Sequence, residues 1–169
     1  GNDGVAFGYQ ALKANTTGAD NTAFGAYAAD AITTGSQNVV IGKNSLSGAT
    51  GGHRNVVIGK DCCDAGDPND AIVIGVDAGR VMTGDKNVAI GGKSLESLGN
   101  SHNNTAVGYK SLAAATSGTE NTGFGLEAGS AVTTGSYNTI IGRSGMAGGD
   151  TSTPANNTAH LNIAIGHST

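Results

Sequence analysis

The residues best suited to metal chemistry lie in one acidic stretch, residues 61–70. It holds four carboxylates in ten residues, those of Asp61, Asp64, Asp67 and Asp70. Hard cations such as Ca²⁺ take several oxygen ligands, which makes these side chains weak candidates for a calcium site. Their spacing matches neither an EF-hand loop nor the glycine-rich calcium roll. We therefore favour a solvated acidic turn, and we expect neither a metal nor a cofactor.

Thiols and imidazoles are the other groups that could react or bind metal. Cys62 and Cys63 are adjacent, which gives no disulfide framework. We expect buried free thiols, with a strained vicinal disulfide as the alternative. The histidines look scattered and lack metal-ligand spacing; they are His53, His102, His160 and His167. No nucleophile–base, paired-carboxylate or phosphate-loop pattern stands out, so we expect the chain not to be an enzyme.

A lengthened interval near the C-terminal end is a different kind of candidate site. It adds about seven residues, within 148–158, to an otherwise regular spacing. An extended loop in a regular array projects from one face and often carries binding. A receptor loop and a tolerated bulge are equally good interpretations. The candidate receptor residues are Asp150, Thr151, Thr153, Asn156 and Asn157.

All of these residues are positioned by ten copies of one motif, namely Asn, a β-branched residue, a small residue, a large apolar residue and Gly. The motif asparagines are Asn21, Asn38, Asn55, Asn87, Asn104, Asn121, Asn138 and Asn162, and the copies at 4–8 and 71–75 lack this residue. The motif glycines are Gly8, Gly25, Gly42, Gly59, Gly75, Gly91, Gly108, Gly125, Gly142 and Gly166. They are spaced 17, 17, 17, 16, 16, 17, 17, 17 and 24 residues apart, which chance does not produce.

The period predicts a stacked β structure. The residues before each motif glycine are rich in Val, Ile, Thr and Phe, which favour strands, and glycine lets the backbone turn at positive φ. A unit of about 17 residues has room for two short strands and two turns but cannot hide its apolar side alone. Stacking the units in parallel, ~4.8 Å apart, satisfies the strands and lets the asparagines form an amide ladder. We predict an all-β parallel β-solenoid of about ten coils, with residues 1–169 as one repeat domain.

Both sides of the predicted strands are apolar. The residue before each motif glycine is always large, as in Phe24 and Ile58, and the residue before that is never polar, as in Ala23 and Val57. A strand buried on one side only should alternate with polar residues. Either the roll is narrow enough to bury both sides, or the side with the small residues packs on another chain. We favour assembly, because small residues allow chains to approach closely about an axis.

Composition limits the classes of function. Aromatic residues make up 4% of the chain and there is no Trp, so we expect a thin repeated core. A net charge of −4 offers no basic face for nucleic acid. No apolar run approaches the ~18 residues that span a bilayer, so we expect no membrane insertion by this segment. The chain begins within the repeat, with no signal peptide in view, and we expect an excised piece of a longer fibre.

The Asn-x-Ala-Ile-Gly and Asn-Thr-Ala-Phe-Gly units resemble the head repeats of YadA-like trimeric autotransporter adhesins and similar repeats of bacteriophage tail fibres. The resemblance covers the whole chain. It implies a left-handed parallel β-roll, three copies of which pack about a common axis on a bacterial surface or a virion tail. The coils here are longer than is typical of that family, and Thr-Thr-Gly replaces a second half-motif. Thr-Thr-Gly together with Asn-Thr-Ala-Phe/Val-Gly-Tyr favours the phage fibre type.

These observations lead to one expected function and two alternatives. We expect an extracellular, homotrimeric structural or adhesive fibre segment that binds a host-surface glycan or protein or acts as a rigid spacer. The first alternative is a monomeric ice-binding solenoid, although the threonines do not form regular Thr-x-Thr rows. The second is a polysaccharide-cleaving tailspike, although neither longer coils nor an acidic cleft is evident.

Overall fold

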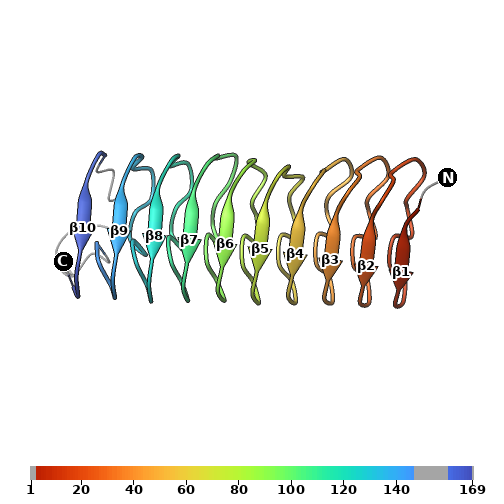
Figure 1. The fold of residues 1–169 in the computed structure, drawn as a ribbon, viewed down its shortest axis with the longest axis horizontal. Coiled ribbons are helices and arrows are strands. Elements are labelled where there is room, and N and C mark those ends of the chain that lie inside the picture. The colour runs from red at the N-terminus through yellow and green to blue at the C-terminus, as the bar shows by residue number, and fades with distance from the viewer. Residues whose placement is uncertain (1–2, 147–159, 169) are drawn as a thin grey trace.

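The protein is an all-β solenoid. The computed structural model describes residues 3–146 and 160–168, and these residues form ten parallel strands in one sheet and no helix. The strands lie side by side in sequence order (Figure 1). They are β1 (Val5–Phe7), β2 (Thr22–Phe24), β3 (Val39–Ile41), β4 (Val56–Ile58), β5 (Ile72–Ile74), β6 (Val88–Ile90), β7 (Thr105–Val107), β8 (Thr122–Phe124), β9 (Thr139–Ile141) and β10 (Ile163–Ile165).

The repeat motif sets the register of the sheet. Equivalent residues stand directly beside one another, as in the pairs Val39–Val56, Val40–Val57 and Ile41–Ile58. Each strand is three residues long, and successive strands are joined by a return path of turns. The expectation of two strands per coil was wrong. Left-handed residues such as Asn44 (φ 53°) and Leu46 (φ 49°) interrupt the return path, so no second extended run forms there.

The motif glycines close each strand in a conformation that needs glycine. Gly42 has φ 134°, a region that residues with a Cβ rarely enter. The coils also touch here, because a Cβ on Gly42 would lie 2.1 Å from the carbonyl oxygen of Gly59 in the next coil. The expected turn at positive φ is confirmed, and close stacking is a second reason for glycine at this position.

The core lies between the middle residues of the strands and a column of side chains on the return path. The middle residues of β2–β9 are buried, for example Val40 and Val57, and they share one apolar cluster with Leu46, Leu95 and Leu112. The side with the small residues therefore faces the interior of its own chain. The preference for packing that side on another chain was wrong, because the large residues before the motif glycines are the ones that point outward.

Candidate functional site

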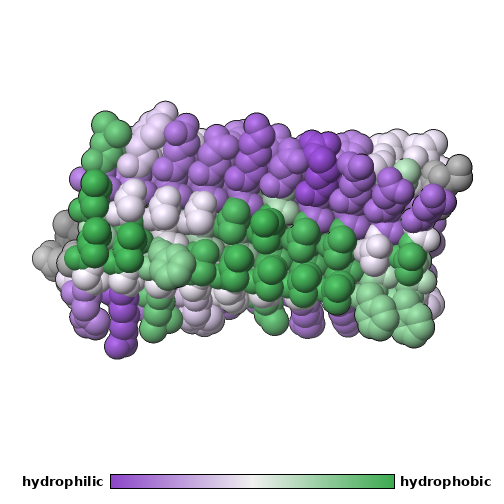
Figure 2. All heavy atoms as spheres, viewed as in Figure 1, coloured by the Kyte–Doolittle hydropathy of each residue, from purple (hydrophilic) through white to green (hydrophobic). Residues whose placement is uncertain are grey.

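The outward residues of the strands form a continuous apolar face. We define the apolar face as the first and third residues of β1–β10; the third residue is apolar in every strand, and the first is threonine in β2, β7, β8 and β9. Ten of its members are exposed large apolar side chains: Val5, Phe7, Phe24, Val39, Ile41, Ile72, Phe124, Ile141, Ile163 and Ile165. Leu161, which precedes β10 and lies outside this set, is exposed as well. Exposure is 38–40% at Val39, Ile41 and Ile72 in the middle of the array. Figure 2 shows the resulting hydrophobic band along the length of the solenoid, with a hydrophilic surface beside it.

Aromatic rings continue the apolar face at its N-terminal end. The rings of Phe7 and Phe24 are stacked, with centroids 4.7 Å apart and an interplanar angle of 10°. Tyr9 and Tyr27, just after the motif glycines, meet edge to face at 5.3 Å. Both pairs join residues one coil apart. The rings therefore strengthen the stacking of coils as well as widening the apolar surface.

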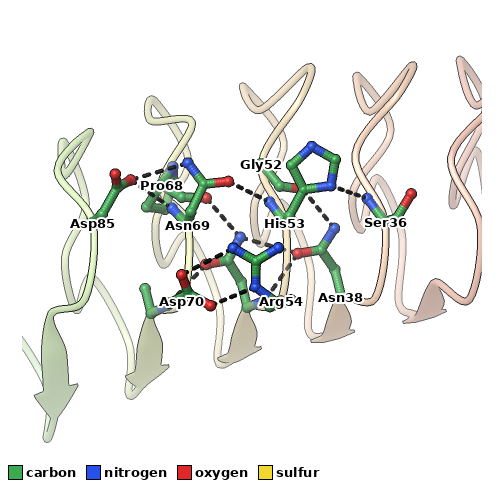
Figure 3. Close-up of polar contacts among 11 residues, drawn as sticks. Ser36, Asn38, Gly52, His53, Arg54, Pro68, Asn69, Asp70 and Asp85 are labelled. Atoms are coloured by element: carbon green, nitrogen blue, oxygen red, sulfur yellow. Dashed lines mark hydrogen bonds and ion pairs between the residues drawn. The ribbon is translucent and has the colours of Figure 1, made fainter.

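A buried row of asparagines runs through the solenoid, and we call it the inner ladder. The Oδ1 atom of Asn38 accepts bonds from the backbone N–H and the Nδ2 of Asn55, both at 3.0 Å. Its own Nδ2 donates to the Gly52 carbonyl at 2.8 Å (Figure 3). The same Nδ2 donates to Asn21 Oδ1 at 3.0 Å. Asn38 is fully buried. The predicted amide ladder is confirmed, and it also binds the backbone of the next coil.

The inner ladder is interrupted at Ala71. The backbone N–H of Ala71 donates to Asn55 Oδ1 at 3.0 Å, but alanine has no amide to offer to Asn87 in the next coil. Asn87 Nδ2 instead donates to the Gly84 carbonyl of its own coil, at 2.9 Å. From Asn87 onward the ladder resumes, with Asn104 donating to Asn87 Oδ1. The inner ladder therefore has two segments, on either side of the step from β5 to β6.

A second row of polar side chains was missed from the sequence, and we call it the outer ladder. In it, a side chain accepts the backbone N–H of the equivalent residue in the preceding coil. Its members stand two residues before the motif asparagine or its substitute: Ser36, His53, Asn69, Asp85, His102, Ser136 and His160. Three of the four histidines that looked scattered thus share one column, and they accept through Nδ1. The column could have been found by counting two residues back from each motif asparagine. It was missed because the residue types at this position vary, although each of these side chains accepts a hydrogen bond.

The four acidic candidates are not brought together. Asp61 contacts Lys60 and Asn44, Asp67 accepts from the Gly51 N–H at 2.9 Å, and Asp70 forms a two-pronged ion pair with Arg54 at 2.6 and 3.0 Å. Within residues 3–146 and 160–168, no three His, Cys, Asp or Glu side chains are placed to hold a metal ion. Asp61, Asp67 and Asp70 therefore act separately, each on its own coil or on the coil before it.

The local environments of three of these carboxylates differ. The hydrogen bond from Arg54 holds the pKa of Asp70 below its usual range. Hydrogen bonds from Lys60 and Asn44 lower the pKa of Asp61 in the same way. Burial raises the pKa of Asp64, whose Oδ1 is buried with no hydrogen-bond partner in the described part of the chain.

The two cysteines are free and fully buried, as predicted. They occupy the positions that Ser45 and Leu46 hold one coil earlier, facing the core. Burial raises the pKa of Cys62 to about 12 and raises that of Cys63 as well. Since the thiolate is the reactive form, neither side chain is suited to redox chemistry in the folded chain.

The candidate receptor residues Asp150, Thr151, Thr153, Asn156 and Asn157 lie outside the described residues. Several of the threonines considered for ice binding form hydrogen bonds within the protein. The hydroxyls of Thr16, Thr33 and Thr116 donate to the carbonyls of Thr33, Thr50 and Thr133, one coil on. These hydroxyls act as stacking bonds between coils.

No protein-family model, curated protein or solved structure matches this chain. Across the described residues there is also no helix with the length and apolar character needed to cross a membrane.

Proposed function

We propose that the chain is a rigid structural segment of an extracellular fibre, and that it assembles with copies of itself through the apolar face. The single observation that carries the proposal is that large apolar side chains point outward along the whole sheet. Contiguous exposed apolar surface of this kind marks interaction sites on soluble proteins. A homotrimer about a common axis is the state that the resemblance to YadA-like heads and tail fibres implies.

The shape of the apolar face favours a second copy of the chain as the partner. Ten strands spaced ~4.8 Å apart make a straight strip about 43 Å long, with apolar side chains repeating at every step. A second copy offers the same period, so side chains of two chains can interdigitate along the full length. A rotation axis parallel to the solenoid brings identical levels together and closes the assembly.

Residues at the two sides of the face allow a direct test. Ile41 and Ile72 are 39% and 40% exposed, so replacing both with lysine should leave the single-chain fold intact. We expect multi-angle light scattering to give a trimer mass for the parent chain and a monomer mass for the Ile41→Lys/Ile72→Lys variant. Val81→Lys is the matched control, because Val81 is 37% exposed but lies in a turn outside the strands.

The result that would overturn the proposal is a parent chain that is monomeric over a wide concentration range. Circular dichroism of each variant separates loss of assembly from loss of the fold. A double-lysine variant that keeps the parent mass and the parent spectrum would also show that copies do not meet at this face.

The fibre serves as a rigid spacer or carries adhesion to a host-surface glycan or protein, on a virion tail or a bacterial surface. In-register stacking with ladders inside and outside supports the mechanical part of this role. Binding of the intact segment to host cells, competed by released surface glycans, tests the adhesive part. A segment that binds no cells would be a spacer.

A further inference from the structure

The inner ladder is interrupted between the same two coils that the outer ladder joins with two hydrogen bonds. Between the coils of β5 and β6, Ala71 offers Asn87 neither of the two side-chain bonds that join successive asparagines elsewhere. At the same step, Asp85 Oδ1 accepts two bonds from Asn69, one from the backbone N–H at 2.9 Å and one from Nδ2 at 3.0 Å. These are the same two donor groups that Asn55 offers to Asn38 in the inner ladder.

Other steps of the outer ladder are simpler. His53 accepts one bond from the Ser36 N–H, His102 accepts one from the Asp85 N–H, and Ser136 accepts one from the Thr119 N–H. The inner ladder is present at the steps beside these bonds, as between Asn121 and Asn138. The doubled bond therefore stands where the inner ladder is missing.

We propose that the Asn69–Asp85 pair replaces the missing rung at Ala71 and holds the two segments of the inner ladder together as one cooperative solenoid. The stability of a stacked repeat array is the sum of its units and of the interfaces between neighbours. An interface that lost both ladders would be the weakest in the array, and the chain would open there first. Figure 3 shows the pair beside the Arg54–Asp70 ion pair, which joins the coils one step earlier.

Hydrogen exchange of the assembled or single chain, read by mass spectrometry, tests this proposal. Asp85→Ala removes the acceptor of both bonds, and Asp85→Asn keeps Oδ1 while removing the charge. Ser136→Ala is the matched control, since it removes an outer acceptor where the inner ladder is intact. We expect Asp85→Ala to raise the opening constant of peptides across β5 and β6. This increase should be on the order of ten times the increase that Ser136→Ala causes for peptides across β8 and β9. Asp85→Asn should stay close to the parent.

Repeating the Asp85→Ala substitution in a second parent chain tests whether the Asn69–Asp85 pair compensates for the missing asparagine. Ala71→Asn restores an amide at the interrupted position, and in this background the effect of Asp85→Ala should shrink to that of Ser136→Ala. An undiminished effect would show that the two ladders are independent, which overturns the proposal. If the Ala71→Asn chain does not fold, the comparison of Asp85→Ala with Ser136→Ala decides alone, and equal local effects would refute the proposal.

Discussion

Replacing Asn38 with alanine removes one complete rung from the inner ladder. Asn38 is fully buried between Asn21 and Asn55, and its amide serves both neighbouring coils. In the Asn38→Ala chain, the backbone N–H of Asn38 still donates to Asn21 Oδ1, so that oxygen remains paired. Two buried backbone groups lose their partners, namely the Asn55 N–H and the Gly52 carbonyl.

The magnitude follows from these two orphaned groups. A buried donor or acceptor left without a partner costs about 1–3 kcal/mol, so the substitution should lower the free energy of unfolding by roughly 2–6 kcal/mol. Asn55 Nδ2 adds little to this cost, because it still donates to the Pro68 carbonyl at 2.7 Å. The loss is large compared with that of an exposed substitution, which usually stays within about 0.5 kcal/mol.

Urea unfolding followed by far-ultraviolet circular dichroism measures the change, and hydrogen exchange at the Asn55 amide locates it. Asn103→Lys is the control, because Asn103 is exposed beside the ladder and Lys86 holds the same position one coil earlier. The reasoning is refuted if Asn38→Ala and Asn103→Lys have the same urea midpoint, or if the Asn55 amide exchanges no faster in Asn38→Ala than in the parent chain.

Three further predictions concern the turns, the thiols and the ion pair. Gly42→Ala should abolish or severely weaken folding, since the new Cβ would lie 2.1 Å from the Gly59 carbonyl oxygen; a parent-like melting temperature would contradict this. Cys62 and Cys63 should react with a thiol reagent at neutral pH only after unfolding, and stability should fall as pH rises from 9.0 toward about 12, where an unfolded thiol ionises and the buried Cys62 does not. Because Arg54 lowers the pKa of Asp70, the pair stabilises the fold above pH 3.8 and loses this effect as pH falls further. Urea midpoints of Arg54→Gln measured over this range should therefore fall less steeply with acid than those of the parent.

Much of the fold could be predicted because its causes are local and repeated. The spacing of the motif glycines placed all ten strands, and the positive φ of Gly42 follows from the absence of a Cβ at a tight turn. The asparagine column predicted the inner ladder, since equal spacing puts equivalent residues above one another. The break at Ala71 was equally visible in the sequence, as a motif copy that lacks the asparagine.

The tertiary structure alone decided which side of the strands faces inward. Strand geometry divides residues between two sides, but polarity identifies the core only when one side is polar, and here Val40 and Ile41 are both apolar. The structure settles the matter by placing the middle residue of the strand, such as Val40, in the buried cluster with Leu46 and leaving the third residue, such as Ile41, on the outside. The outer ladder occupies a fixed position, two residues before the motif asparagine, but only the distances across coils show its role. A hydroxyl, an imidazole and a carboxylate can each accept the same backbone N–H, so the residue types at this position do not reveal a shared function.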